Sequence, residues 1–124
     1  MCFFVNKPRV LRKLGKFIVR VSQVKIGMGE VIREDAAILK SFMPPSEEYG
    51  VFYKHIMKIF ESMTNLETGL RLDKVTANEV ADRMPMMRGM VQSLETNFGA
   101  LKASQKNAEK LVDAHFRRAN APNR

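Results

Sequence analysis

Cysteine and tryptophan are nearly absent from this chain of 124 residues, which has one cysteine, Cys2, and no tryptophan. A single cysteine excludes an intramolecular disulfide and the zinc sites that need two or more thiolates. It suits a reducing compartment, or one in which cysteine is simply unused. We therefore expect no disulfide, no metal and no bound cofactor.

Long apolar runs are missing as well. The longest uncharged stretches fall far short of the roughly 20 residues that a helix needs to cross a bilayer. Residues 1–5 are apolar, but Lys7, Arg9 and Arg12 follow them, whereas a secretory signal carries its charges before its apolar run. The sequence predicts a cytoplasmic protein, with peripheral contact to a membrane as an alternative.

Acidic residues are missing before Glu30, so the charge is unevenly spread along the chain. The whole sequence has 21 Lys and Arg against 13 Asp and Glu, a net charge of +8. Residues 1–43 alone hold nine basic residues against three acidic ones. Such an excess attracts an anionic partner, which can be nucleic acid, an acidic lipid surface or an acidic protein face.

What the chain does contain is three stretches whose apolar residues recur at alternating steps of three and four. The first stripe is Val10, Leu14, Phe17, Val21, Val24, Met28 and Val31. The second is Phe52, Ile56, Ile59, Met63, Leu66 and Leu70. The third is Val80, Met84, Met87, Val91, Leu94, Phe98 and Leu101. A mean step of 3.5 is typical of long helices that pack in bundles or coiled coils.

Prolines and capping residues set the expected bounds of the first two helices. A basic first helix is expected over residues 8–43, because Pro44 and Pro45 follow and stop it. A second helix is expected over residues 46–71, with Ser46 as its N-cap and acidic residues in its first turn.

A third helix is expected over residues 77–117. Thr76 and Glu79 have the spacing of a capping box at its start. Pro85 falls inside this helix and removes one backbone hydrogen bond, so we expect a kink there. The first and third helices are longer than the second, and their surplus apolar surface favours self-association or a protein partner.

These elements predict one all-α domain over residues 1–124. It begins with an apolar segment at 1–7 and ends with a polar tail at 118–124. The architecture is an antiparallel three-helix bundle, or a coiled-coil-like helical hairpin with a third helix packed along it. β-branched residues and two glycines give an alternative, in which a short β-hairpin near 17–32 accompanies two or three helices.

The basic residues of the first and third helices are the candidate sites for an anionic partner. They are Arg9, Arg12, Lys13, Lys16 and Arg20, followed by Lys102, Lys106 and Lys110. Opposite the first five lies an apolar face, so this helix can pack in a core, lie in a membrane interface or contact nucleic-acid phosphates. No zinc finger or short helix-turn-helix is present, so any nucleic-acid binding would be non-specific.

Methionines gather around the internal proline, and Met84, Pro85, Met86, Met87 and Met90 form a candidate partner face. Methionine fills irregular cores and adaptable binding surfaces, although thioethers also suit Cu(I).

Two polar residues, Asp35 and Gln105, interrupt otherwise apolar stripes. Buried polar groups of this kind often set helix register and the number of partners.

His55 with Lys58 three residues later resembles the phosphorylation motif of histidine phosphotransfer domains. The resemblance implies that His55 accepts a phosphoryl group and that Lys58 steadies it. Those domains usually have a small residue directly after the lysine, where this chain has Ile59. Nucleotide-binding glycine loops and paired Glu-x-x-His motifs are missing from the sequence. We therefore expect no enzymatic activity.

The function expected from these features is that of a non-enzymatic structural or assembly subunit. It would oligomerise or dock on a larger complex through its apolar helix stripes, with the basic first helix facing an anionic partner. The alternative is a peripheral membrane protein or a non-specific nucleic-acid binder that acts through the same basic helix.

Overall fold

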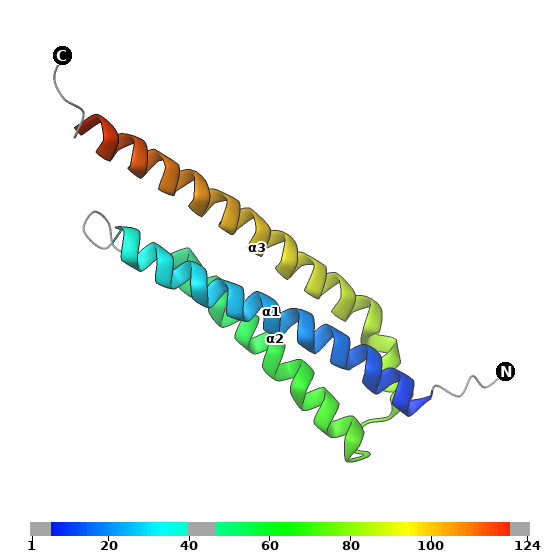
Figure 1. The fold of residues 1–124 in the computed structure, drawn as a ribbon. Coiled ribbons are helices and arrows are strands. Elements are labelled where there is room, and N and C mark those ends of the chain that lie inside the picture. Colours follow the sequence, from blue (N-terminus) through cyan, green and yellow to red (C-terminus); the bar gives the residue numbers. More distant parts are fainter. Residues whose placement is uncertain (1–5, 40–46, 120–124) are drawn as a thin grey trace.

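A computed structural model describes residues 6–39 and 47–119, and this part of the chain forms three helices (Figure 1). They are α1 (Lys7–Leu39), α2 (Glu47–Arg71) and α3 (Ala77–Ala119). α2 runs back along α1, and α3 runs in the same direction as α1 (Figure 1). The predicted all-α bundle is confirmed. The β-hairpin alternative near 17–32 is wrong, because these residues all lie within α1.

The start of α1 is capped by a residue that the sequence analysis did not single out. The Asn6 Oδ1 atom accepts a hydrogen bond from the Arg9 backbone N–H at 3.5 Å. Pro8 lies in the first turn, where its missing N–H costs nothing. The expected end of this helix at residue 43 and its two following prolines lie outside the described residues.

The capping box at the start of α3 is confirmed. The Glu79 backbone N–H donates to the Thr76 Oγ1 atom at 3.1 Å, and the Thr76 N–H donates to the Glu79 carboxylate at 3.3 Å. The helix runs through Pro85 without a break, so the expected kink at this residue stays a prediction. For α2, Glu47 and Glu48 occupy the first turn, while Ser46 lies outside the described residues.

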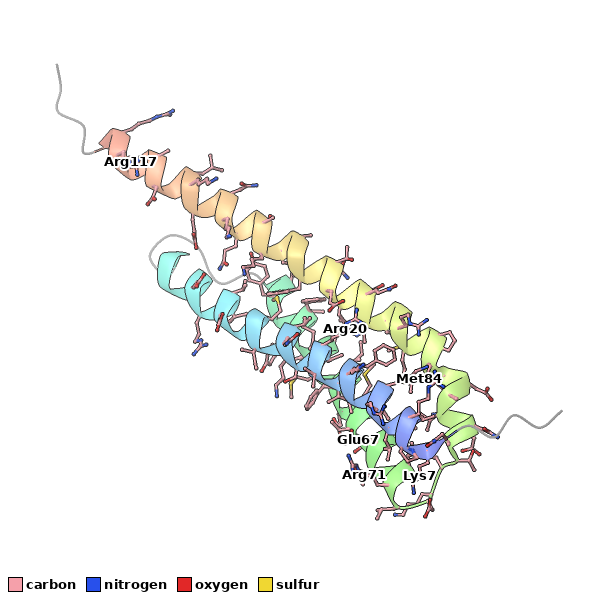
Figure 2. All side chains as sticks on the ribbon, turned by 45° about the vertical axis from the view of Figure 1, so that its right-hand side comes forward. Lys7, Arg20, Glu67, Arg71, Met84 and Arg117 are labelled. Carbon is pink, nitrogen blue, oxygen red and sulfur yellow. The ribbon has the colours of Figure 1, made fainter. Side chains whose placement is uncertain are left out.

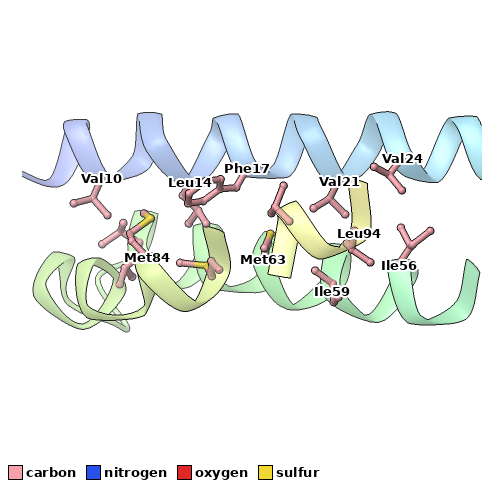
Figure 3. Packing of buried hydrophobic residues seen from close by; sticks show 14 of the residues in the cluster. Val10, Leu14, Phe17, Val21, Val24, Ile56, Ile59, Met63, Met84 and Leu94 are labelled. Atoms are coloured by element: carbon pink, nitrogen blue, oxygen red, sulfur yellow. The ribbon is translucent and has the colours of Figure 1, made fainter. Parts of the chain in front are cut away.

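The three predicted stripes meet in one core (Figure 3). α1 contributes Val10, Leu14, Phe17, Val21, Val24, Met28 and Val31, all of them buried. α2 contributes Ile56, Ile59, Met63 and Leu70. α3 contributes Val80, Met84, Met87, Val91 and Leu94. Each such burial contributes roughly 1.5–3 kcal/mol before conformational entropy is counted, so this core is what holds the helices together.

α1 is the central helix of the bundle. It packs along both α2 and α3, whereas the backbones of α2 and α3 approach each other at only a few positions. A second apolar row on α1, formed by Leu11, Ile18 and Ile32, is partly buried against the same core and widens its packing face. α1 therefore supplies one side of both helix interfaces, and the flanks of α2 and α3 that face each other stay open.

α1 and α3 approach closely at Gly27. A Cβ atom placed on Gly27 would overlap the tip of the Phe98 ring. This position therefore needs glycine despite its low helix propensity. Gly29, two residues further on, has open space where its Cβ would lie, and nothing in the structure explains it.

The last part of α3 continues past the core residues. Gln105 is the last buried residue of α3 among those whose side chains the structure describes. Beyond it the described side chains are exposed or half-buried, and Leu111 is 72% exposed. Figure 2 shows Arg117 near the projecting end of the helix. We call residues 106–119 the α3 arm.

Candidate functional site

An apolar groove lies between α2 and α3, on the flanks that these two helices do not bury against each other. Its volume is about 550 Å³. Its apolar lining comes from Ile59, Met63 and Leu66 of α2, Val75 of the connecting loop, and Met86, Met87 and Met90 of α3. Polar residues surround it, and the depression continues past His55, Ser93 and Asn97. We call this surface the methionine groove.

The predicted methionine face divides between the core and this groove. Met84 is buried in the core, and Pro85 is exposed. Met86, Met87 and Met90 line the groove together. Met86 is 63% exposed, so its side chain is accessible to a partner at the groove.

The α2 half of the groove was missed by the sequence analysis. Ile59, Met63 and Leu66 were recognised as members of an apolar stripe, but nothing indicated that one flank of that stripe would stay uncovered.

The charged residue that lines the groove is Arg83, and no carboxylate lines it among the described residues. Lys58 is exposed on α2 next to Ile59 of the groove. A groove of this kind can hold the apolar face of a helix whose flanks carry negative charge.

The predicted anion-binding residues of α1 fall into two groups. Arg9, Arg12, Lys13 and Lys16 are exposed, and none of them forms an ion pair within the described part of the chain. Arg20 differs because it is joined to Glu95 of α3.

Arg20 and Glu95 connect α1 and α3 across their interface. Figure 2 labels Arg20 between these two helices. The Arg20 Nε atom donates to Glu95 Oε2 at 3.1 Å, and the Arg20 Nη2 atom pairs with Oε1. This hydrogen bonding lowers the pKa of Glu95 and raises the pKa of Arg20. The charge of Arg20 is therefore balanced within the protein.

The predicted cations of α3 lie away from the basic end of α1. Lys102 sits over the Phe98 ring, with its Nζ atom 5.9 Å from the ring centroid. Lys102 and Lys106 border a small depression together with Glu30, Glu34 and Glu109. Lys110 is exposed on the α3 arm. The structure thus does not bring the two predicted basic sets together, and carboxylates surround part of the second set.

Gln105 lies buried in the α1–α3 interface, and its Nε2 atom donates to the Val31 carbonyl at 2.7 Å. This hydrogen bond joins the two helices at one level of the interface, whereas a register-setting role stays a prediction. The side chain of Asp35, the second residue predicted for that role, lies outside what the structure describes.

His55 and Lys58 are both exposed on α2, but phosphotransfer stays untested by this arrangement. Within the described residues, no group of three His, Cys, Asp or Glu side chains is placed to hold a metal ion. In the same part of the chain, none of the helices combines the length and apolar character needed to cross a bilayer.

No protein-family model, curated protein or solved structure matches this chain.

Proposed function

We propose that this protein is a non-enzymatic assembly subunit whose methionine groove binds an amphipathic helix of a partner protein. The observation that carries the proposal is the separation of α2 and α3. Each packs on α1, and the flanks that face each other leave an apolar surface open. A fourth helix laid in the groove would close it in the manner of a four-helix bundle.

The groove has the length and the side chains that such a helix needs. Its α3 side extends from Arg83 to Asn97, which is about 21 Å at roughly 1.5 Å per residue. That length accommodates about four turns of a partner helix. Methionine side chains adapt to the shape of an incoming apolar face, because they are unbranched and flexible.

The positive charge of the groove and of the whole chain favours an acidic partner helix over a second copy of this chain. The groove is lined by Arg83 and by no described carboxylate, and the whole chain carries a net charge of +8. One helical segment that a second copy could offer is the α3 arm. That arm is itself basic, since Lys106, Lys110, Arg117 and Arg118 outnumber Glu109 and Asp113. An acidic partner is attracted where the arm would be repelled.

The test uses a designed helical peptide of about 14 residues, the length that matches the groove. One version has leucines on one face and glutamates on the other, and the second has lysines in place of the glutamates. Fluorescence anisotropy should show tighter binding of the glutamate peptide. Met86→Gln should weaken this binding about tenfold, because loss of a central apolar contact costs more than about 1 kcal/mol.

Leu111→Gln is the matched control, because Leu111 is an equally exposed apolar residue outside the groove. It should leave peptide binding unchanged. Equal weakening by both substitutions, or tighter binding of the lysine peptide, would contradict the proposal. Light scattering provides a second outcome. If a dimer forms with rising concentration and is lost in Met86→Gln, the groove binds a second copy of this chain and not an acidic partner.

A further inference from the structure

We propose that the surface where α1 and α3 meet, near the start of both helices, binds the phosphate backbone of double-stranded DNA. The residues that carry the proposal are Arg9, Arg12, Lys13 and Lys16 of α1 together with Arg88 of α3, which the sequence analysis did not identify. We call these five residues the basic seam. It lies away from the methionine groove, and its test is independent of the groove.

The Arg20–Glu95 pair fixes the register that places Arg88 on this surface. α1 and α3 run in the same direction, so positions two helical turns earlier on each helix also face each other. Two turns before Arg20 and Glu95 lie Lys13 and Arg88. Two turns after them lie Gly27 and Lys102, which border one depression as this register requires.

No cation of the basic seam forms an ion pair among the described residues. α1 contains no acidic residue before Glu30, and Glu95 of α3 is paired with Arg20. Glu67 of α2 reaches within 4.0 Å of the Cβ position of Gly15, but its ion pair is with Arg71. Lys13 and Arg88 therefore present exposed like charges on neighbouring helices, and a bound polyanion relieves their repulsion.

The spacing of the seam suits a DNA duplex. Arg9 to Lys16 cover about 10 Å of α1 at roughly 1.5 Å per residue. A duplex carries one negative charge per roughly 1.7 Å of axis, so the same length offers about six phosphates. Five cations on two rigid, packed helices can contact this array at little cost in conformational entropy.

The other anionic partners fit the seam less well. Insertion into a membrane needs an exposed apolar face, but the apolar stripe of α1 is buried in the core, and only Val19 and Ile26 are exposed large apolar residues in described α1. Tight protein interfaces centre on aromatic, arginine or apolar anchors in well-packed pockets, whereas the five seam cations are all exposed. Single strands need aromatic platforms, which the seam also lacks.

The test measures binding of a short fluorescent DNA duplex by anisotropy at several salt concentrations. Five phosphate contacts predict a slope of about −4.5 in a plot of log K against log salt, which is about a 500-fold loss of affinity between 50 and 200 mM salt. The Lys13→Gln, Arg88→Gln variant should reduce the slope by about 1.8, to about a 40-fold loss over the same range.

Lys54→Gln, Lys58→Gln is the matched control, because it removes the same charge from exposed positions on α2. It should leave the slope close to that of the unchanged protein. The same reduction in both double variants would mean that only net charge matters, and it would overturn the seam as a site. Tighter binding to phosphatidylserine vesicles or to polyglutamate than to the duplex would overturn the assignment to DNA.

Discussion

Two glycines of α1 provide a direct test of how closely α1 and α3 pack. Replacing glycine by alanine inside a helix stabilises it by up to about 1 kcal/mol, because the unfolded chain loses less freedom on folding. Gly29→Ala should show this gain, since its Cβ would meet open space. Gly27→Ala gains the same helix propensity, but it forces the Phe98 ring out of its place.

Overpacking of a core typically costs about 1–3 kcal/mol. Set against the propensity gain, Gly27→Ala should lower the free energy of unfolding by about 1 kcal/mol. The two alanine variants should then differ by about 2 kcal/mol, or about 8 °C in Tm for a domain of this size. Urea denaturation followed by far-UV circular dichroism measures this difference.

A third variant identifies Phe98 as the cause. In a Phe98→Ala background the ring is gone, so Gly27→Ala should become as stabilising as Gly29→Ala. The reasoning would be refuted if both glycine substitutions stabilised the unchanged protein equally. It would also be refuted if Gly27→Ala stayed destabilising after the ring had been removed.

Substitutions at three further residues test the contacts that hold the helices. Thr76→Ala should lower the free energy of unfolding by about 1 kcal/mol through loss of the α3 cap, and Thr76→Ser should restore most of it in urea denaturation. Glu95→Gln should flatten the acid side of the stability–pH curve. The pKa of Glu95 is lowered in the folded protein, so its contribution is present above the unfolded pKa of about 4.3 and is lost as pH falls through the folded value. Gln105→Ala should cost about 2 kcal/mol by leaving a cavity and removing a buried hydrogen bond, while Gln105→Leu should cost less than about 1 kcal/mol in thermal unfolding.

The helices and their buried faces could be predicted because they depend on local spacing. The alternating steps of three and four identify the side of each helix that is buried, and Thr76 with Glu79 marks the start of α3 to the residue. The β-hairpin alternative relied on β-branched residues and two glycines, and it was wrong because the helical spacing of the buried Phe17, Val21 and Val24 outweighed their strand propensity. The close approach of Gly27 to the Phe98 ring depends on a residue of another helix.

The candidate site could be predicted only in part, because its contacts join distant positions. Arg20 looked like a free cation until Glu95, 75 residues later, was placed beside it. The same α1–α3 register is the reason why Arg88 was assigned to a position opposite Lys13. The methionines around Pro85 were found from sequence, but the open flank of α2 was not. Periodicity shows which face of a helix is buried. It does not show where two helices are placed around a third, or which of their flanks stay uncovered.

The central position of α1 has a consequence for the exchange of parts between molecules. α3 packs mainly against α1. In a molecule whose segment between Arg71 and Ala77 straightened, α3 would therefore pack on α1 of a second molecule. The α1–α3 contacts would then form between two chains, as in a domain-swapped dimer. The methionine groove of such a dimer would be lined by α2 of one chain and α3 of the other.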